Sequence, residues 1–201
     1  MDLEKLEKNL RKKGYEVCIL EKKEDMKEYL KDRFHNTTIG FGDSITIKKT
    51  GFYESVMEDN VLFDPNRSET YDDFLELARK AMNAEYFFTG VNAMTENGEI
   101  VNLDGTGNRI AGSLFGHKKV YYVLGTNKIV KDLDEAIFRT RNIAAPKNAR
   151  RLGLSTPCAV NADKCYDCSS MDRICNGLLI NYRKMDEIEA EVIIIREELG
   201  L

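Results

Sequence analysis

The sequence predicts an α/β fold with a Rossmann-like, mostly parallel sheet, helices on both faces, and a cysteine-rich C-terminal extension. Three observations lead to this prediction. Short segments rich in β-branched and aromatic residues alternate with amphipathic segments of about ten residues or more, which is typical of a layered parallel sheet. Two glycine-rich turns directly follow predicted strands. Four of the five cysteines lie between positions 158 and 175.

Hydrophobic periodicity places the individual elements. A first helix carries Leu3, Leu6 and Leu10 on one stripe and ends at Gly14. Later helices are expected at 25–34, 45–57 with an interruption at Gly51, 71–83, 133–143 and 146–152. Strands are expected at 15–20, 37–41, 61–63, 85–89, 100–103 and 119–124, and two more near the C-terminus at 178–185 and 189–196.

The composition is that of a globular protein with one α/β domain at residues 1–155. Residues 156–201 are expected to form a cysteine-rich, metal-binding loop and C-terminal strands that pack on the same domain. A formal net charge of −4 argues against nucleic acid or an anionic membrane as a partner, because both attract basic surfaces. The sequence has neither a signal-like start nor an apolar run of membrane-spanning length. We therefore expect a cytoplasmic protein.

Two glycine-rich turns are expected to meet in one crevice, since ligands of open α/β sheets bind beyond the carboxyl ends of the strands. Their candidate ligand-binding residues are Gly40, Gly42, Ser44, Gly105, Thr106, Gly107, Asn108 and Arg109, with Asn92 just upstream of the second turn. Glycines let backbone N–H groups approach an anion closely, so the crevice is expected to take a small anionic ligand such as a sugar phosphate or an acyl group.

Other interpretations of these turns stay open. Ser44 or Asp43 would serve equally well as the N-cap of an ordinary helix, and Asp104 and Arg109 would serve as a structural ion pair. The catalytic residue is unknown, with Glu96 and Asp104 as the candidates for proton transfer. His117 lies in a Gly-His-Lys turn and is expected to be exposed to solvent.

The cysteines predict a metal centre. Their spacing is C-x6-C-x2-C-x6-C, formed by Cys158, Cys165, Cys168 and Cys175. Four thiolates supply a complete ligand shell for zinc or for a cubane iron–sulfur cluster. Structural zinc sites commonly use two C-x2-C knuckles, whereas only one such pair is present here, which favours a 4Fe-4S cluster over the zinc alternative. Two disulfides or free thiols are the remaining possibilities.

The stretch GVNAMTENGEIVNLDGTGNRIA, from Gly90 onwards, resembles the signature of the lactate-utilisation (LUD) domain family. It is also similar to the corresponding segment of methylthioribose-1-phosphate isomerases and related initiation-factor subunits. The resemblance continues through KVYYVLGTNKIV, from Lys119, and DEAIFRTRNIAAP, from Asp134. The segments TPCAV, CYDC and RICN, which carry the cysteines, resemble the cysteine-bearing branch of the same family.

This resemblance implies the fold of the superfamily that contains ribose-5-phosphate isomerases, glucosamine-6-phosphate deaminases and coenzyme A transferases. It also implies an iron–sulfur accessory or electron-transfer component of organic-acid oxidation that works beside redox partner subunits, with a dimer compatible with the pattern. The alternative is an isomerase or transferase that acts on a sugar phosphate or acyl-coenzyme A ligand at the Gly40 and Gly105 turns, with structural cysteines. A fold of this kind hosts many chemistries, so the substrate and the question of turnover stay open.

Overall fold

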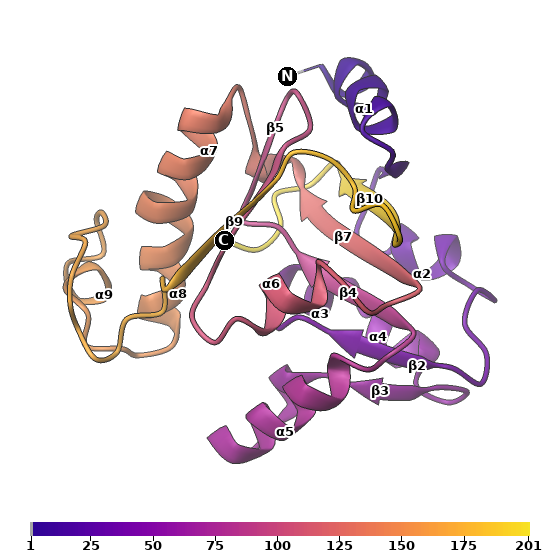
Figure 1. Ribbon diagram of the computed structural model, residues 1–201, viewed down its shortest axis with the longest axis horizontal. Helices are drawn as coiled ribbons and strands as arrows, with labels where there is room; N and C mark the ends of the chain where they lie inside the picture. The colour runs from indigo at the N-terminus through magenta and orange to yellow at the C-terminus, as the bar shows by residue number, and fades with distance from the viewer. Residues whose placement is uncertain (1) are drawn as a thin grey trace.

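The computed structural model describes residues 2–201 and, within them, centres on a six-stranded sheet in which every pairing is parallel (Figure 1). In spatial order its strands are β1 (Glu16–Leu20), β10 (Glu189–Ile195), β7 (Lys119–Gly125), β4 (Tyr86–Gly90), β2 (Thr38–Phe41) and β3 (Val61–Phe63). The α/β fold with a mostly parallel sheet is therefore confirmed.

Helices cover both faces of this sheet. One face packs against α2 (Asp25–Tyr29), α3 (Ile45–Thr50) and α4 (Phe52–Val56). The other packs against α1 (Leu3–Lys12) and the end of α5 (Tyr71–Ala81). Gly51 separates α3 from α4 in a left-handed conformation with φ of 66°, as the interruption in the pattern predicted. The helix expected at 25–34 is shorter, because α2 ends at Tyr29.

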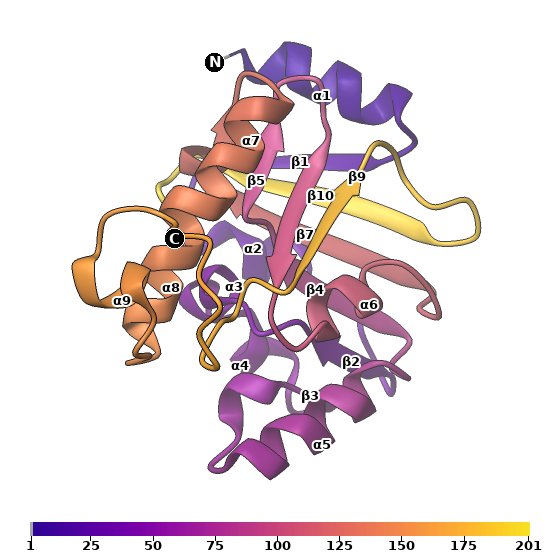
Figure 2. The same cartoon turned by 60° about the vertical axis from the view of Figure 1, so that its left-hand side comes forward.

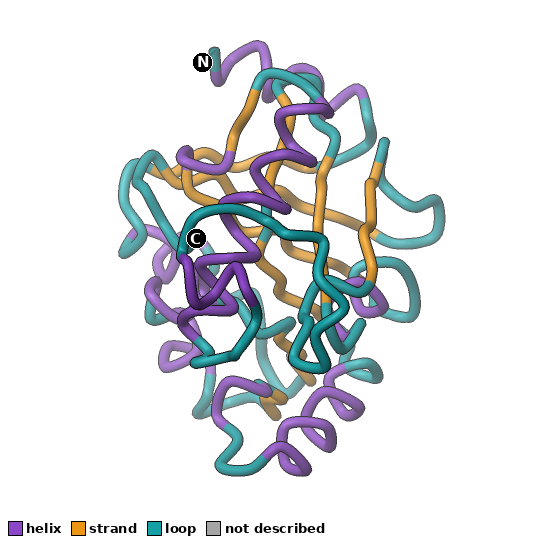
Figure 3. Tube along the Cα trace, turned by 90° about the vertical axis from the view of Figure 1, so that its left-hand side faces the viewer, coloured by secondary structure: helices purple, strands orange, loops and turns teal. Residues whose placement is uncertain are grey.

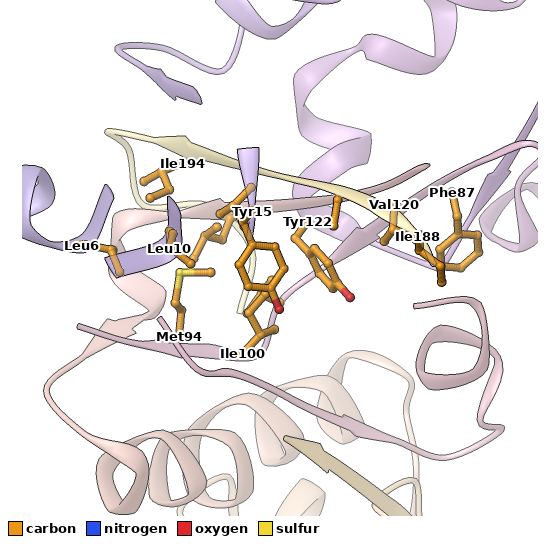
Figure 4. Packing of buried hydrophobic residues seen from close by; sticks show 14 of the residues in the cluster. Leu6, Leu10, Tyr15, Phe87, Met94, Ile100, Val120, Tyr122, Ile188 and Ile194 are labelled. Carbon is orange, nitrogen blue, oxygen red and sulfur yellow. The ribbon is translucent and has the colours of Figure 1, made fainter. Parts of the chain in front are cut away.

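Two hydrophobic clusters fill the space between the sheet and its cover. Tyr121 and Tyr122 are consecutive on β7 and point into different clusters, as alternation along a strand requires. Figure 4 shows the cluster that contains Tyr122, where the Tyr15 ring meets it edge-on with 6.1 Å between the ring centroids. Leu6 and Leu10 of α1 close the same cluster, so the predicted leucine stripe is the buried face of that helix.

A second, four-stranded sheet packs over this cluster (Figure 2). Its strands, in spatial order, are β8 (Ile129–Val130), β5 (Ala93–Thr95), β6 (Ile100–Asp104) and β9 (Gly177–Asn181). The sequence predicted a strand at the position of β6 but neither β5 nor a separate sheet. Met94 of β5 and Ile100 of β6 are fully or almost fully buried against the main sheet. The second sheet therefore covers this part of the main sheet, where a helix would otherwise pack.

One long helical stretch runs beside the second sheet, and the cysteine-bearing segment starts against its end (Figure 1). It consists of α7 (Leu133–Arg139), a wide π-type turn at Thr140–Ala144, and α8 (Ala145–Arg151). The sequence predicted two separate helices here. The wide turn keeps the chain helical through Pro146, whose missing N–H and ring would break a regular helix interior.

The C-terminal part of the chain completes both sheets. After the short helix α9 (Pro157–Asn161), where a loop was expected, β9 joins the second sheet and β10 inserts between β1 and β7. Short 3₁₀ turns occupy Pro65–Arg67 and Thr126–Lys128, and α6 (Asn108–Gly112) follows the second glycine turn. Among the described residues, no helix is both long and apolar enough to span a bilayer.

His117 corrects one sequence expectation. Its side chain is buried, stacks on Phe87 with 4.8 Å between ring centroids, and places Nδ1 2.6 Å from the Ala84 carbonyl oxygen. Burial lowers the pKa of this imidazole. The residue is part of the core rather than an exposed turn.

Candidate functional site

A cavity of about 390 Å³ lies beyond the carboxyl ends of four neighbouring strands, β2, β4, β7 and β10. The loops that follow these strands line it with Ser44, Asn92, Lys128 and Gly200, respectively. The chain leaves β2 outward to β3 and returns to β4 on the other side of β2. Connections diverge at such a switch point, which leaves the crevice where open α/β sheets bind ligands. The volume suits a small molecule.

The first glycine turn brings a hydroxyl and a carboxylate to this cavity. Ser44 caps α3 by accepting a hydrogen bond from the backbone N–H of Ile47 at 3.3 Å, so the N-cap interpretation holds for Ser44. A Cβ on Gly90 would lie only 2.5 Å from the Ser44 hydroxyl oxygen. Glycine at position 90 therefore lets this hydroxyl sit directly against β4.

Asp43 is the strained member of the same turn. Its φ of 54° is in the left-handed region, a conformation that costs a non-glycine residue on the order of 1 kcal/mol. Burial raises the pKa of its carboxyl, while the nearby guanidinium groups of Arg109 and Arg151 oppose that shift. A half-buried carboxyl of this kind, at the wall of a cavity, is suited to hold or move a proton.

The second turn is held from within by Asp104. One carboxylate oxygen accepts the N–H of Gly105 at 3.0 Å, and the other accepts those of Arg109 at 2.9 Å and Ile110 at 3.3 Å. The guanidinium of Arg109 donates to the Leu103 carbonyl at 2.5 Å and to the Asn92 amide oxygen at 3.4 Å. Both side chains line the cavity, but the carboxylate of Asp104 already accepts hydrogen bonds from the backbone of the turn.

Hydrogen bonds hold Asn92 in place where the chain passes from β4 to the second sheet. Its backbone N–H donates to Asn102 Oδ1 at 2.9 Å, and its own Oδ1 accepts the N–H of Leu103, also at 2.9 Å. The buried guanidinium of Arg139 donates to the Asn92 carbonyl at 2.5 Å and to the Asn127 carbonyl at 3.1 Å. This bracing joins the loops after β4 and β7 into one rigid wall.

The structure brings most of the predicted crevice residues together. The cavity lining includes Ser44, Asn92, Asp104, Gly105, Thr106, Asn108 and Arg109. Gly42 and Gly107 belong to the same turns without lining the cavity.

Two other predicted residues lie elsewhere. Gly40 is inside β2, where a Cβ would meet the Ala81 carbonyl oxygen at 2.5 Å, so it allows α5 to approach the sheet. Glu96 sits at the turn between β5 and β6, where its carbonyl accepts a hydrogen bond from Asn9 of α1. It is absent from the cavity lining.

Sequence reasoning missed several polar residues of the cavity. Thr140, Asn148 and Arg151 come from the long helical stretch, and Lys128 follows β7. The side-chain amide nitrogen of Asn108 and the hydroxyl of Thr140 are buried without a hydrogen-bond partner among the described residues. Buried polar atoms are normally paired, so these two favour a polar ligand. The wide turn that begins at Thr140 is of a type frequent at functional sites.

A signal for Lys128 was present in the sequence. It follows the strand at 119–125 by three residues, and polar residues at that distance from the carboxyl end of a parallel strand face the crevice. The helical residues carry no such signal, because their position depends on how the long helix packs.

The four clustered cysteines share one segment beside the long helix. Cys158 is on α9, and the other three lie in the stretch between α9 and β9, which Figure 3 shows as loop. All four thiols are unpaired and partly buried. Arg173 ties this stretch together by donating to the carbonyls of Cys168 at 2.6 Å and Cys175 at 3.1 Å. Burial raises the pKa of the Cys175 thiol, and the nearby thiols of Cys165 and Cys168 add to that effect.

These thiols offer the donor chemistry of a four-sulfur site without an assembled ligand shell. Within residues 2–201, no three His, Cys, Asp or Glu side chains meet closely enough to hold a metal ion. The guanidinium of Arg141 lies 3.8 Å from the sulfur of Cys165, which also accepts the Asp167 N–H at 3.3 Å. The donor set fits the group in type and number, and the four-cysteine metal centre stays a prediction.

The cysteine segment also touches the cavity. The backbone N–H of Asn176 donates to the Asp104 carbonyl at 2.9 Å, and its side-chain amide donates to the Gly105 carbonyl at 3.2 Å. Ile174 lines the cavity beside Gly105. The second glycine turn is therefore a contact shared by the cavity and the cysteine segment.

Comparison with known proteins agrees with this architecture. The crystal structure of a DUF162 family protein from Deinococcus radiodurans superposes with a TM-score of 0.54 at 13% sequence identity, over 96% of this chain and 95% of that one. This likeness shows a shared fold. A search of curated proteins found no significant match. Residues 3–195 match the LUD domain, and the chain therefore belongs to the LUD domain family.

Proposed function

We propose that this LUD domain protein binds a small organic anion, of the carboxylate type handled in lactate utilisation, in the cavity at the strand ends. The observation that carries the proposal is the chemistry of the lining. Arg109 and Arg151 bring guanidinium groups into one small cavity and Lys128 adds an amine, while the unpaired Asn108 amide and Thr140 hydroxyl add polar groups suited to an anion's oxygens.

The charge balance of the lining supports an anion. Its ionisable side chains are Asp43, Asp104, Arg109, Lys128 and Arg151. Asp104 is neutralised by three backbone N–H groups and by Arg109, whose Nε lies 3.6 Å away. Burial raises the pKa of the Asp43 carboxyl, and Arg109 and Arg151 oppose that shift. The cationic side chains of the lining thus outnumber its carboxylates, which favours a ligand carboxylate in this cavity.

Calorimetry with lactate, pyruvate, ribose 5-phosphate and acetyl-coenzyme A tests this proposal. We expect a short carboxylate to bind, with its affinity reduced about tenfold or more in Arg151→Gln, because a charged hydrogen bond contributes about 1.5–3 kcal/mol. Arg150→Gln is the matched control, since Arg150 is exposed on the same helix and does not line the cavity. Selective binding of the sugar phosphate or the thioester would instead favour an isomerase or transferase.

The cysteine segment supports an accessory redox role beside this cavity, in which the protein passes electrons to partner subunits of organic-acid oxidation. The supporting observation is that Cys165 and Cys168 are near enough to Cys175 to raise the pKa of its thiol, and that Arg173 binds the carbonyls of Cys168 and Cys175. Together with Cys158, they would hold a 4Fe-4S cluster. Such a cluster supplies one-electron transfer.

Oxygen-free purification with iron, sulfide and zinc analysis tests the cluster. We expect about four irons and four sulfides per chain with visible charge-transfer absorbance. Both should be lost in Cys165→Ser and Cys168→Ser but kept in Cys18→Ser, since Cys18 is remote on β1. One zinc per chain, without iron or sulfide, would mean that the cysteines form a structural zinc site instead of a cluster. If protein purified without exposure to air contains neither iron nor zinc, the redox role is excluded and the cavity proposal is unaffected.

A further inference from the structure

Lys128 is a buried amine at the cavity wall. Its side chain lies at the end of the short turn after β7, is only 5% exposed, and lines the cavity. Its Nζ donates to the hydroxyl of Thr46 at 3.0 Å. Among the described residues it forms no ion pair with an Asp or Glu. Lysines are rarely buried without such a partner, because a buried and uncompensated ammonium is costly.

The charges around Lys128 favour its neutral form. Burial, and after it the cationic Arg139 of α7, Arg109 of α6 and Lys49 of α3, lowers the pKa of Lys128 to about 7. The cavity carboxyls do not offset this effect. Asp104 is engaged by the second glycine turn, and Asp43 faces Arg109 and Arg151. A lysine desolvated beside other cations is the environment that activates amines as nucleophiles.

We propose that Lys128 is a catalytic nucleophile that forms an imine with the carbonyl group of a short 2-oxo acid bound in this cavity. The inference rests on the proposed function, which places an organic carboxylate beside Arg109 and Arg151. A 2-oxo acid matches the lining because it joins an anionic carboxylate directly to an electrophilic carbonyl carbon. The guanidinium groups would hold the carboxylate, and the amine would meet the adjoining carbon.

The reaction is a condensation that needs no oxidant or reductant. The lone pair of Lys128 Nζ forms a bond to the carbonyl carbon, and the carbonyl oxygen takes up a proton to give a carbinolamine. The nitrogen then expels this oxygen as water, so that the two hydrogens of the amine leave with it and a carbon–nitrogen double bond forms. Asp43 lines the same cavity and has a carboxyl whose protonated form burial favours. It is the acid–base group available to carry the proton.

The alternative is a purely structural Lys128. Within residues 2–201 its one hydrogen bond, to Thr46, is to a neutral hydroxyl, and a structural role would be met at least as well by an apolar side chain. The two roles differ in a direct chemical readout. An imine can be reduced to a stable amine, whereas a structural lysine in the same position gives no adduct.

The test is reductive trapping with pyruvate and sodium cyanoborohydride at pH 7, followed by peptide mass spectrometry. We expect one dominant adduct on Lys128, heavier by the mass of pyruvic acid less one oxygen atom. At this pH a surface lysine is neutral in roughly one molecule in a thousand or fewer, so Lys128 should be labelled at least about tenfold faster than the exposed Lys131. Lys128→Arg should lose the adduct, and Lys131→Arg, the control, should keep it. Acetone, which has no carboxylate, should label Lys128 much more slowly.

Calorimetry with pyruvate in the absence of reductant separates this inference from the proposed function. If pyruvate binds and Lys128 is labelled no faster than Lys131, the imine is excluded and the cavity proposal survives. If pyruvate neither binds nor labels Lys128, both proposals fail. Selective labelling together with binding that weakens in Arg151→Gln would support both.

Discussion

The carboxylate of Asp104 accepts the backbone N–H of Arg109 at 2.9 Å and lies 3.6 Å from the guanidinium Nε of the same residue. This pairing closes the glycine turn after β6 on itself. Asn176 donates to the Asp104 carbonyl from the other side at 2.9 Å. One residue thus organises the cavity wall, the start of α6 and the attachment of the cysteine segment.

Asp104→Ala should destabilise the fold by about 1–3 kcal/mol, because three backbone N–H groups lose their acceptor and part of the turn is buried. Asp104→Asn keeps a carbonyl oxygen as acceptor and should lose less. Urea unfolding of the two variants measures the difference. Equal stability of wild type and the alanine variant would show that the turn holds without this carboxylate.

The sequence predicted correctly those elements whose position is set by a local pattern of residues. Leu3, Leu6 and Leu10 marked the buried face of α1, and Gly51 marked the break between α3 and α4. The second sheet was missed because β8 has two residues and β5 has three. Segments that short show no periodicity. They are strands only because β5 pairs with β6 and β8 pairs with β5.

The site was predictable in part for the same reason. Ser44, Asn92 and Arg109 lie in turns that directly follow strands, so chain order alone pointed to them. Thr140 and Arg151 reach the cavity because the long helical stretch lines one of its walls, and that placement depends on tertiary packing. Gly40 was expected to bind a ligand as part of the first glycine-rich turn. The structure places it against α5 instead, where the backbones approach closely.

Gly40→Ala should therefore destabilise the fold by about 1–3 kcal/mol. A Cβ at this position would lie 2.5 Å from the Ala81 carbonyl oxygen and 3.0 Å from its Cα, so backbone must move. Gly177→Ala is the matched control in a strand, because its Cβ would meet Ile110 at an ordinary 3.5 Å. Thermal unfolding compares the two. If Gly40→Ala lowers the unfolding temperature no more than Gly177→Ala does, α5 shifts freely on the sheet.

Asp43→Asn should stabilise the fold at neutral pH. Burial raises the folded-state pKa of Asp43 above its unfolded value of about 3.9. The contribution of this group to stability is therefore fully present below about pH 4 and is lost as the pH rises through the folded-state pKa. Asparagine also tolerates the left-handed φ of 54° at this position.

Urea unfolding between pH 3 and pH 8 measures this effect. The variant should gain on the wild type as the pH rises and show no gain at the acidic end. Asp186→Asn is the control, because Asp186 is exposed. A difference between wild type and the Asp43 variant that does not change with pH would mean that Asp43 titrates normally.

Lys128 should make the stability of the protein rise with pH above neutrality. Its folded-state pKa is lowered to about 7 by burial and by three neighbouring cations, whereas the unfolded value is about 10.4. Between these two values the unfolded chain binds more protons than the folded one, so the free energy of unfolding increases by up to about 1.4 kcal/mol per pH unit. Below about pH 7 both states are protonated and the full penalty remains.

Lys128→Met removes this term and should be more stable than the wild type at pH 6, with the difference shrinking towards pH 10. Lys131→Met, at an exposed position, should leave the curve unchanged. Parallel curves for the wild type and the Lys128 variant would show that the amine is solvated in the cavity and remains charged at neutral pH.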